Sequence, residues 1–218
     1  MSLRVKDEIR IKEIVENIGA QFRYGCYNQK RPEACHLLAE FFETIKEDLH
    51  KAGIIYKSNC DDYKYGRSCF SYAHHKLLGR NGDSDGAFHY FCKGCDLGVG
   101  ESCLSAGLMC IGDGKHATRT KDYKKGLQLL GKGCDSNQHF CCYFMGAVYM
   151  SGLPDANIER DIAVARKYSE KGCALGSAMA CQALSQMYLT GDGVPRDEQK
   201  AHDYRARAQQ LHNSSPFL

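Results

Sequence analysis

The sequence predicts an all-α fold: a solenoid of five helix pairs with an N-terminal capping helix, stapled by disulfides. Three observations predict it: cysteine pairs that recur at a regular interval, an aspartate at a fixed distance before most pairs, and small residues at fixed distances from both. The interval is 34–39 residues. Periods of this size are typical of helical repeat arrays.

Ten of the 13 cysteines fall into pairs whose members are eight or nine residues apart. The first members step by 34, 35, 39 and 39 residues, and the second members by 34, 34, 39 and 39. Such regularity indicates one structural unit repeated along the chain. The pairs are Cys26 with Cys35, Cys60 with Cys69, Cys95 with Cys103, Cys134 with Cys142, and Cys173 with Cys181.

The same interval governs the residues that start helices and let them pack. An aspartate stands 12 residues before each first cysteine from the second pair on, and one more continues the series: Asp48, Asp83, Asp122, Asp161 and Asp197. Aspartate is a preferred N-cap because its carboxylate accepts hydrogen bonds from the first turn. Small residues follow each aspartate and each second cysteine by four positions: Ala52, Ala87, Gly126, Ala165, Ala201, and Ala39, Ala73, Gly107, Gly146, Ser185. They allow two helix axes to approach closely.

Each repeat is therefore expected to contain two helices. Helix A carries the second cysteine in its first turn, and helix B begins at the aspartate and ends near the next first cysteine. The predicted parts are a capping segment 1–32, repeats 33–65, 67–99, 101–137, 139–176 and 178–212, and a tail 213–218. The capping helix, expected over 6–29, should cover the open end of the solenoid with an apolar stripe. That stripe contains Val5, Ile9, Ile11, Ile14, Val15 and Ile18.

The last repeat carries a family motif. The motif consists of Tyr188, Gly191, Gly193, Val194, Asp197, Lys200 and Ala201. This pattern resembles the Sel1-like repeat, and weaker copies cover residues 33–212. The tyrosine position is Lys76 in repeat two and Cys110 in repeat three, and the loop of repeat four is longer. The resemblance implies a right-handed, TPR-like α/α superhelix.

Cysteine pairs across repeat boundaries narrow the resemblance to the Hcp-like branch. That branch contains cysteine-rich bacterial proteins once described as β-lactamase-like and a eukaryotic cytochrome c oxidase assembly factor. The spacing of nine residues in the first two pairs and eight in the later ones resembles the eukaryotic side, as does the ending Arg207–His212. The resemblance implies a non-enzymatic scaffold for assembly of respiratory complex IV. Its partners would be complex IV subunits or assembly factors and the disulfide relay of protein import.

The cysteine spacing favours disulfides over a metal site. Zinc sites usually bring cysteines in at Cys-x2–4-Cys, whereas a helix–turn–helix junction places two Cα atoms about 5–6 Å apart, which suits a disulfide. Cys92, Cys110 and Cys141 are then left as reduced thiols. Cys92 and Cys95 form a Cys-x-x-Cys motif, which invites a redox interpretation, but the repeat assigns Cys95 to a bridge. We expect no metal and no cofactor; a thiol protein that handles haem or copper is the alternative.

Composition and the N-terminal sequence argue against a nucleic-acid-binding protein, a membrane span and a secretory signal. The net charge is +3 and the charges are interspersed, so no basic face for nucleic acid is evident. No run approaches the ~18 apolar residues of a membrane span. The N-terminus lacks the apolar segment of a secretory signal.

Disulfides persist only in oxidising compartments, and disulfides without a secretory signal predict the mitochondrial intermembrane space. A removed signal would instead indicate a secreted bacterial Hcp-like protein with penicillin-binding or β-lactamase-like activity. No catalytic triad or acylating serine is evident, so we expect a protein that is not an enzyme.

Overall fold

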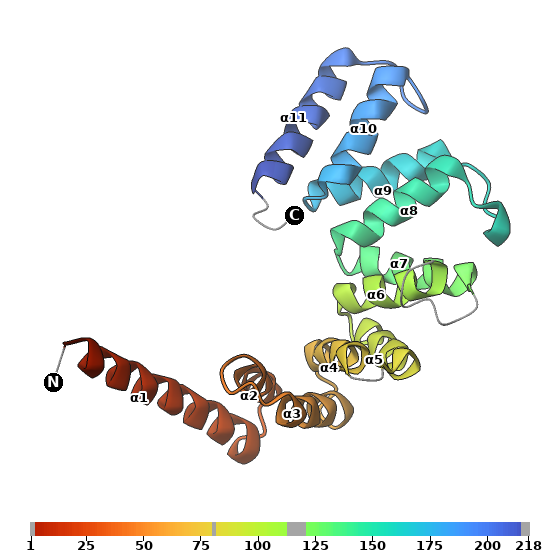
Figure 1. Ribbon diagram of the computed structural model, residues 1–218. Coiled ribbons are helices and arrows are strands. Elements are labelled where there is room, and N and C mark those ends of the chain that lie inside the picture. Colours follow the sequence, from red (N-terminus) through yellow and green to blue (C-terminus); the bar gives the residue numbers. More distant parts are fainter. Residues whose placement is uncertain (1–2, 80–81, 113–120, 215–218) are drawn as a thin grey trace. The chain divides into compact units, whose positions relative to one another are not determined.

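A computed structural model describes residues 3–79, 82–112 and 121–214, with side chains from residue 7 onward (Figure 1). Over these residues the chain is helical, and an isolated bridge between Leu153 and Ile158 is the one β-type pairing. The all-α prediction is confirmed. None of the described helices has the length and apolar character needed to span a bilayer. The chain divides into two compact units, Met1–Leu97 and Gly98–Leu218, which we call unit 1 and unit 2.

Both units are built from antiparallel helix pairs. Unit 1 contains α1 (Leu3–Arg23), a π-helical turn (Tyr24–Asn28), α2 (Pro32–Thr44), α3 (Leu49–Asp61), α4 (Gly66–Leu78) and α5 (Ser84–Asp96). Unit 2 contains α6 (Gly100–Ile111), α7 (Tyr123–Asp135), α8 (His139–Ser151), a 3-10 turn (Pro154–Ala156), α9 (Ile162–Ala174), α10 (Ala178–Thr190) and α11 (Glu198–Ser214). The even-numbered A helices pack on the odd-numbered B helices that follow them. The described residues thus contain five A–B pairs, and α2 and α11 extend one or two residues past the predicted repeat bounds.

The B helices start at the predicted aspartates. The Asp48 carboxylate accepts a hydrogen bond from the backbone N–H of Lys51 at 3.0 Å, and Asp161 accepts one from Val164 at 3.0 Å. The carboxylates of Asp83, Asp122 and Asp197 likewise accept a hydrogen bond from the backbone N–H of the residue three positions later. Each bond satisfies one of the N–H groups that a helix start leaves without an intrahelical partner. The predicted N-caps are confirmed.

The predicted small residues lie where the two helices of a pair cross. Ala39 and Ala52 are fully buried between α2 and α3. In unit 2, a Cβ placed on Gly126 would lie 3.1 Å from the carbonyl oxygen of Gly107 and 2.4 Å from Cγ2 of Ile111. The backbones of α6 and α7 approach so closely at this point that a larger side chain has no room.

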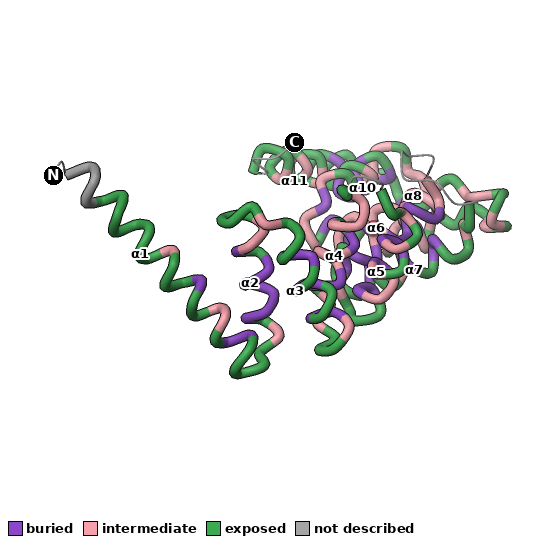
Figure 2. The backbone as a smooth tube through the Cα atoms, turned by 60° about the horizontal axis from the view of Figure 1, so that its bottom comes forward, coloured by how far each residue is buried: buried purple, intermediate pink, exposed green. Residues whose placement is uncertain are grey.

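The capping helix is present, as predicted over 6–29, but its last turn is π-helical. α1 ends at Arg23, and Cys26 lies on the π-helical turn. α1 touches α2 near its own C-terminal end, where Gly19 lies under the Phe41 ring. Farther toward the N-terminus the stripe stays exposed, with Ile11 at 60% and other isoleucines close to half (Figure 2).

The apolar stripe of α1 is therefore only partly covered by α2. Helix α2 has 13 residues and α1 has 21, so the first turns of α1 extend past the end of α2. The side chain of Val5 and most of the predicted tail, 215–218, lie outside the described residues.

Candidate functional site

The bonded cysteines lie at the junctions between repeats. Each disulfide within a unit joins the end of a B helix, or the π-helical turn after α1, to the first turn of the next A helix. The described bonds are Cys26–Cys35, Cys60–Cys69, Cys134–Cys142 and Cys173–Cys181, with Cα–Cα distances of 4.5, 4.8, 4.6 and 4.6 Å. Cys95 and Cys103 are disulfide-bonded as well. The redox state of these cysteines in the cell stays a prediction.

The Cα–Cα distances are shorter than the 5–6 Å expected from sequence. The helices meet more closely than that expectation assumed, because glycine or a small residue stands beside the bridge. A Cβ on Gly172 would lie only 2.9 Å from Cβ of Ala180 and 3.3 Å from Cβ of Cys142. These junctions are therefore tightly packed.

Cys92, Cys110 and Cys141 carry no disulfide, and the latter two are buried. Burial raises the pKa of the Cys141 thiol to about 12, so little thiolate exists at neutral pH. Thiolates, not thiols, are the nucleophiles and metal ligands. Cys110 is 5% exposed at the position that holds Tyr188 in the last repeat. These two thiols act as core residues, and their burial does not favour a haem- or copper-handling role.

The adjacent histidines on α4 have different surroundings. His74 packs edge-on against the rings of Phe70 and Phe91, whereas Nε2 of His75 lies 3.8 Å from the Glu43 carboxylate. Adjacent helical residues do not share a face. Within the described residues, no group of three or more potential metal ligands comes together.

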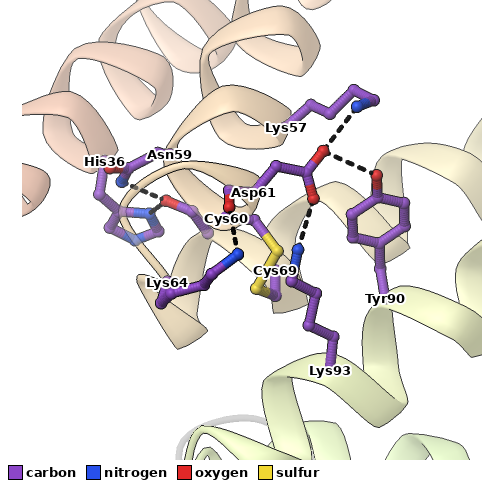
Figure 3. Close-up of a disulfide and its surroundings, with 10 residues drawn as sticks. His36, Lys57, Asn59, Cys60, Asp61, Lys64, Cys69, Tyr90 and Lys93 are labelled. Carbon is purple, nitrogen blue, oxygen red and sulfur yellow. Dashed lines mark hydrogen bonds and ion pairs between the residues drawn. A yellow bond between two sulfur atoms is a disulfide. The ribbon is translucent and has the colours of Figure 1, made fainter.

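A charged cluster lies beside the Cys60–Cys69 bridge (Figure 3). The Asp61 carboxylate accepts bonds from Lys57 at 2.6 Å and Lys93 at 2.5 Å, and from Tyr90 Oη at 3.1 Å. Desolvation alone would raise the pKa of this carboxyl, but the hydrogen bonds outweigh it and lower the pKa to about 2. Since Lys93 and Tyr90 belong to α5, the cluster ties α5 to α3.

This cluster predicts a loss of stability in acid. Because the folded pKa of Asp61, about 2, lies below the unfolded value of about 3.9, its contribution is present above pH ~4 and is lost as the pH falls toward 2. We expect Asp61→Asn to lower the free energy of unfolding at pH 7 by about 1 kcal/mol. Near pH 2 the variant and the wild type should be equal. Urea unfolding at pH 7, 4 and 2.5 measures the difference.

Asp62→Asn is the matched control for this prediction. The Asp62 side chain accepts a bond from the Ser58 hydroxyl at an exposed site and does not join α5 to α3. Its substitution should change stability little at any of these pH values. An Asp61→Asn loss of the same size at pH 2.5 and pH 7 would contradict the ionic origin.

A groove runs across three helices of unit 2. One hollow of 720 Å³ lies between α10 and α11, and a neighbouring hollow of 490 Å³ lies between α8 and α10. Both are lined by Met179, Gln182 and Gln186, so they adjoin along α10. We call this surface the unit 2 groove. Sequence reasoning missed it; the signal was a polar side chain on each turn of an otherwise apolar A helix.

The side chains of the unit 2 groove suit a polypeptide. Gln182 and Gln186 are one turn apart on α10, and Arg205 and Gln209 are one turn apart on α11. An amide side chain donates and accepts at once, which matches the backbone N–H and C=O of a bound chain. Met179, 41% exposed, adds a flexible apolar contact.

Ser185 and His212 line the α10–α11 hollow of the unit 2 groove, but they do not form a nucleophile and base. The Ser185 hydroxyl is buried and donates to the backbone oxygen of Ala201 at 2.7 Å. This hydroxyl is therefore held in the α10–α11 crossing by a backbone oxygen and has no base beside it to activate it, as an acylating serine would need.

The repeats match a known family. The sequence pattern of the Sel1 repeat matches residues 63–99, 100–138, 139–177 and 178–208, which together are more than half of the chain. This chain belongs to the Sel1 repeat family. The matched segments contain the helix pairs from α4–α5 to α8–α9, together with α10 and the first part of α11. Helices α2 and α3 precede them and have the same capping aspartate and bridge.

Curated relatives of this Sel1 repeat protein are similar over part of their length. Cytochrome c oxidase assembly factor 7 homolog of Drosophila melanogaster is 42% identical over 137 residues, which cover 60% of this chain and 51% of that protein. Cytochrome c oxidase assembly factor 7 of Xenopus tropicalis is 34% identical over 130 residues, covering 55% and 56%. The chain thus spans about half the length of the curated relatives it matches.

Solved structures agree on the fold. A Sel1 repeat protein from Oxalobacter formigenes matches with a TM-score of 0.73 at 17% identity, covering 97% of this chain and 85% of that one. At this identity the likeness shows the Sel1 repeat fold alone.

Proposed function

We propose that this Sel1 repeat protein is a non-enzymatic scaffold that takes part in assembly of cytochrome c oxidase and holds a polypeptide segment of a partner in the unit 2 groove. The observation that carries the proposal is the continuous groove with the amide pair Gln182 and Gln186 on α10, faced by Arg205 and Gln209 of α11. Stacked helix repeats present extended surfaces suited to such binding. The similarity to proteins named cytochrome c oxidase assembly factor 7 supports the target.

We infer the mitochondrial intermembrane space as the place of action, with complex IV subunits or assembly factors and the import disulfide relay as partners. The recurring cysteine pairs at the junctions support it, because disulfides persist only where the surroundings are oxidising. Protease treatment of isolated mitochondria tests the location. The protein should be protected in intact mitochondria and digested once the outer membrane is ruptured. Protection that survives rupture would place it in the matrix.

The function is tested by complementation. In cells that lack the endogenous protein, the wild-type chain should restore assembled cytochrome c oxidase, measured by native gel and by oxidase activity. Gln182→Ala/Gln186→Ala should restore less than half of it, because the groove loses its paired amides. The matched control is Gln199→Ala/Gln210→Ala, which removes two exposed glutamines of α11 that do not line the groove.

The outcomes separate the two parts of the proposal. Full restoration by the groove variant, at wild-type protein level, would reject the unit 2 groove as the binding site. Failure of the wild type itself to restore the oxidase would reject the assembly function.

A further inference from the structure

Helix α1 stands where a helix B would stand. Its π-helical turn carries Cys26, which is bonded to Cys35 of α2, just as Cys60 at the end of α3 is bonded to Cys69 of α4. In unit 2, an A helix such as α8 contacts its own B helix, α9, and the A helices α6 and α10. Beside α1 and α2 no part of the described chain occupies the corresponding place of an A helix.

That place is an apolar groove, which we call the α1–α2 groove. Its volume is 280 Å³. It is lined by Val15, Ile18 and Phe22 of α1, by Leu37, Glu40, Phe41 and Thr44 of α2, and by Ile45, which caps the end of α2. Ile18 is 40% and Ile45 55% exposed, so an apolar side chain of α1 and one at the C-terminal end of α2 face solvent. Surfaces of this kind mark binding sites.

The side chains of α1 are the wrong size for an ordinary repeat contact. The other B helices carry alanine or glycine eight residues before the cysteine, whereas α1 carries Ile18 eight residues before Cys26. It likewise carries Ile14 in place of the capping aspartate, and its helix continues toward the N-terminus. Branched side chains at i, i+3, i+4 and i+7 suit ridges-into-grooves packing at an ordinary interhelical distance of about 8–10 Å. The geometry therefore selects a helix as occupant.

One uncompensated charge borders this groove. Among the residues that line it, Glu40 carries the only charged side chain. Its neighbour is His36, whose Nε2 lies 3.3 Å from the carboxylate. Burial lowers the pKa of His36, so at neutral pH the imidazole carries no charge to neutralise Glu40. A basic residue of an occupant would do so.

We propose that the α1–α2 groove binds an amphipathic α-helix of a partner protein. Its apolar stripe lies against Ile18, Phe41 and Ile45. A lysine or arginine beside the stripe pairs with Glu40. This is the helix-in-groove mode of recognition. It is independent of the unit 2 groove, which lies in the other unit and suits a polypeptide held by its backbone.

The test uses a synthetic 18-residue helix as the probe. It carries a leucine stripe at i, i+3, i+4 and i+7 with lysines beside it and a fluorescein label, and a scrambled peptide of the same composition has no stripe. Fluorescence anisotropy with the full chain should show binding at least tenfold tighter for the striped peptide. Ile45→Asp should weaken that binding at least tenfold.

Leu78→Asp is the matched control, because Leu78 is 83% exposed at the end of α4 and does not line the α1–α2 groove. It should bind the peptide like the wild type, and circular dichroism should show both variants folded. Glu40→Lys should lower the affinity for the lysine-flanked peptide and raise it for a glutamate-flanked version. Equal binding by all variants, or equal binding of the scrambled peptide, would overturn the proposal.

Two further results would assign the groove to another occupant and overturn the proposal. One is self-association in light scattering that Ile45→Asp abolishes and Leu78→Asp leaves intact, which indicates a second copy. The other is binding to phosphatidylcholine–cardiolipin vesicles with the same dependence and no binding of the striped peptide, which indicates a membrane surface.

Discussion

Gly126→Ala is expected to lower the free energy of unfolding by about 1–3 kcal/mol, the usual cost of overpacking a close contact. The added Cβ would lie 2.4 Å from Cγ2 of Ile111, 3.0 Å from Cβ of Cys110 and 3.1 Å from the carbonyl oxygen of Gly107. The Ile111 side chain can rotate away, but the Gly107 oxygen belongs to the backbone of α6. The helices α6 and α7 must therefore separate, and contacts along the whole pair weaken. Urea unfolding followed by circular dichroism measures the loss.

Gly131→Ala is the matched control on the same helix. A Cβ at Gly131 meets nothing within 4 Å, so the substitution should raise the free energy of unfolding by about 0.5–1 kcal/mol, because alanine is the better helix former. The same chemical change should thus have opposite signs at two positions of α7, five residues apart. Two losses of similar size would show that the close crossing is not what requires glycine at position 126.

The features that the sequence predicts well are those that depend only on residues within a single repeat. A B helix needs an acceptor at its start, and Asp122 provides one whatever the rest of the chain does. Two crossing helices need small residues at one point, and Ala165 and Gly146 stand there in the fourth repeat. Because these requirements recur, the repeat period makes them visible even where single positions vary.

Features that depend on a neighbour were harder to predict. The stripe on α1 indicates a helix with one apolar face, but it does not say how much of that face is covered. Coverage depends on the length of α2, which ends beside the middle of α1 and leaves Ile11 and Ile14 exposed. An amphipathic pattern predicts that one face of a helix packs against another surface. It does not say whether that surface belongs to the same chain.

The charged cluster and the unit 2 groove were missed for a related reason. Asp61 and Lys93 are 32 residues apart, close to one repeat, so a search for opposite charges one repeat apart would have found them. The groove requires knowledge of which turns of α10 face α11 and α8. Gln182 and Gln186 look like ordinary surface residues until those two helices are in place.

Removing the Cys60–Cys69 bridge by Cys60→Ala/Cys69→Ala is expected to lower the free energy of unfolding by about 2.5–3 kcal/mol. The bridge closes a loop with a sequence separation of nine residues, and the chain-entropy relation gives this value for a loop of about that length. Both sulfurs belong to fully buried residues, so alanine adds a small loss of packing. Cys92→Ala, which removes no bridge, is the control and should cost clearly less.

The free energy of unfolding should fall by no more than about that value, and the junction should stay folded. The reason is that polar hydrogen bonds beside the bridge remain. The Asn59 amide donates to the Ser68 hydroxyl at 2.8 Å, and the Ser68 oxygen lies 3.0 Å from Nδ1 of His36. Asn59 also donates to the carbonyl oxygen of Pro32 at 2.9 Å. These bonds join α2, α3 and the start of α4 without any sulfur. The Cys60→Ala/Cys69→Ala variant should therefore remain helical, with a lower unfolding midpoint.

Alkylation without reductant decides whether the bridges form at all. The paired cysteines predict three alkylated thiols per chain, at Cys92, Cys110 and Cys141 once the protein is denatured. Peptide mapping should then find Cys60 linked to Cys69. Thirteen alkylated cysteines in protein isolated from oxidising conditions would contradict the stapled fold, and with it the argument that leads from cysteine pairs to the intermembrane space.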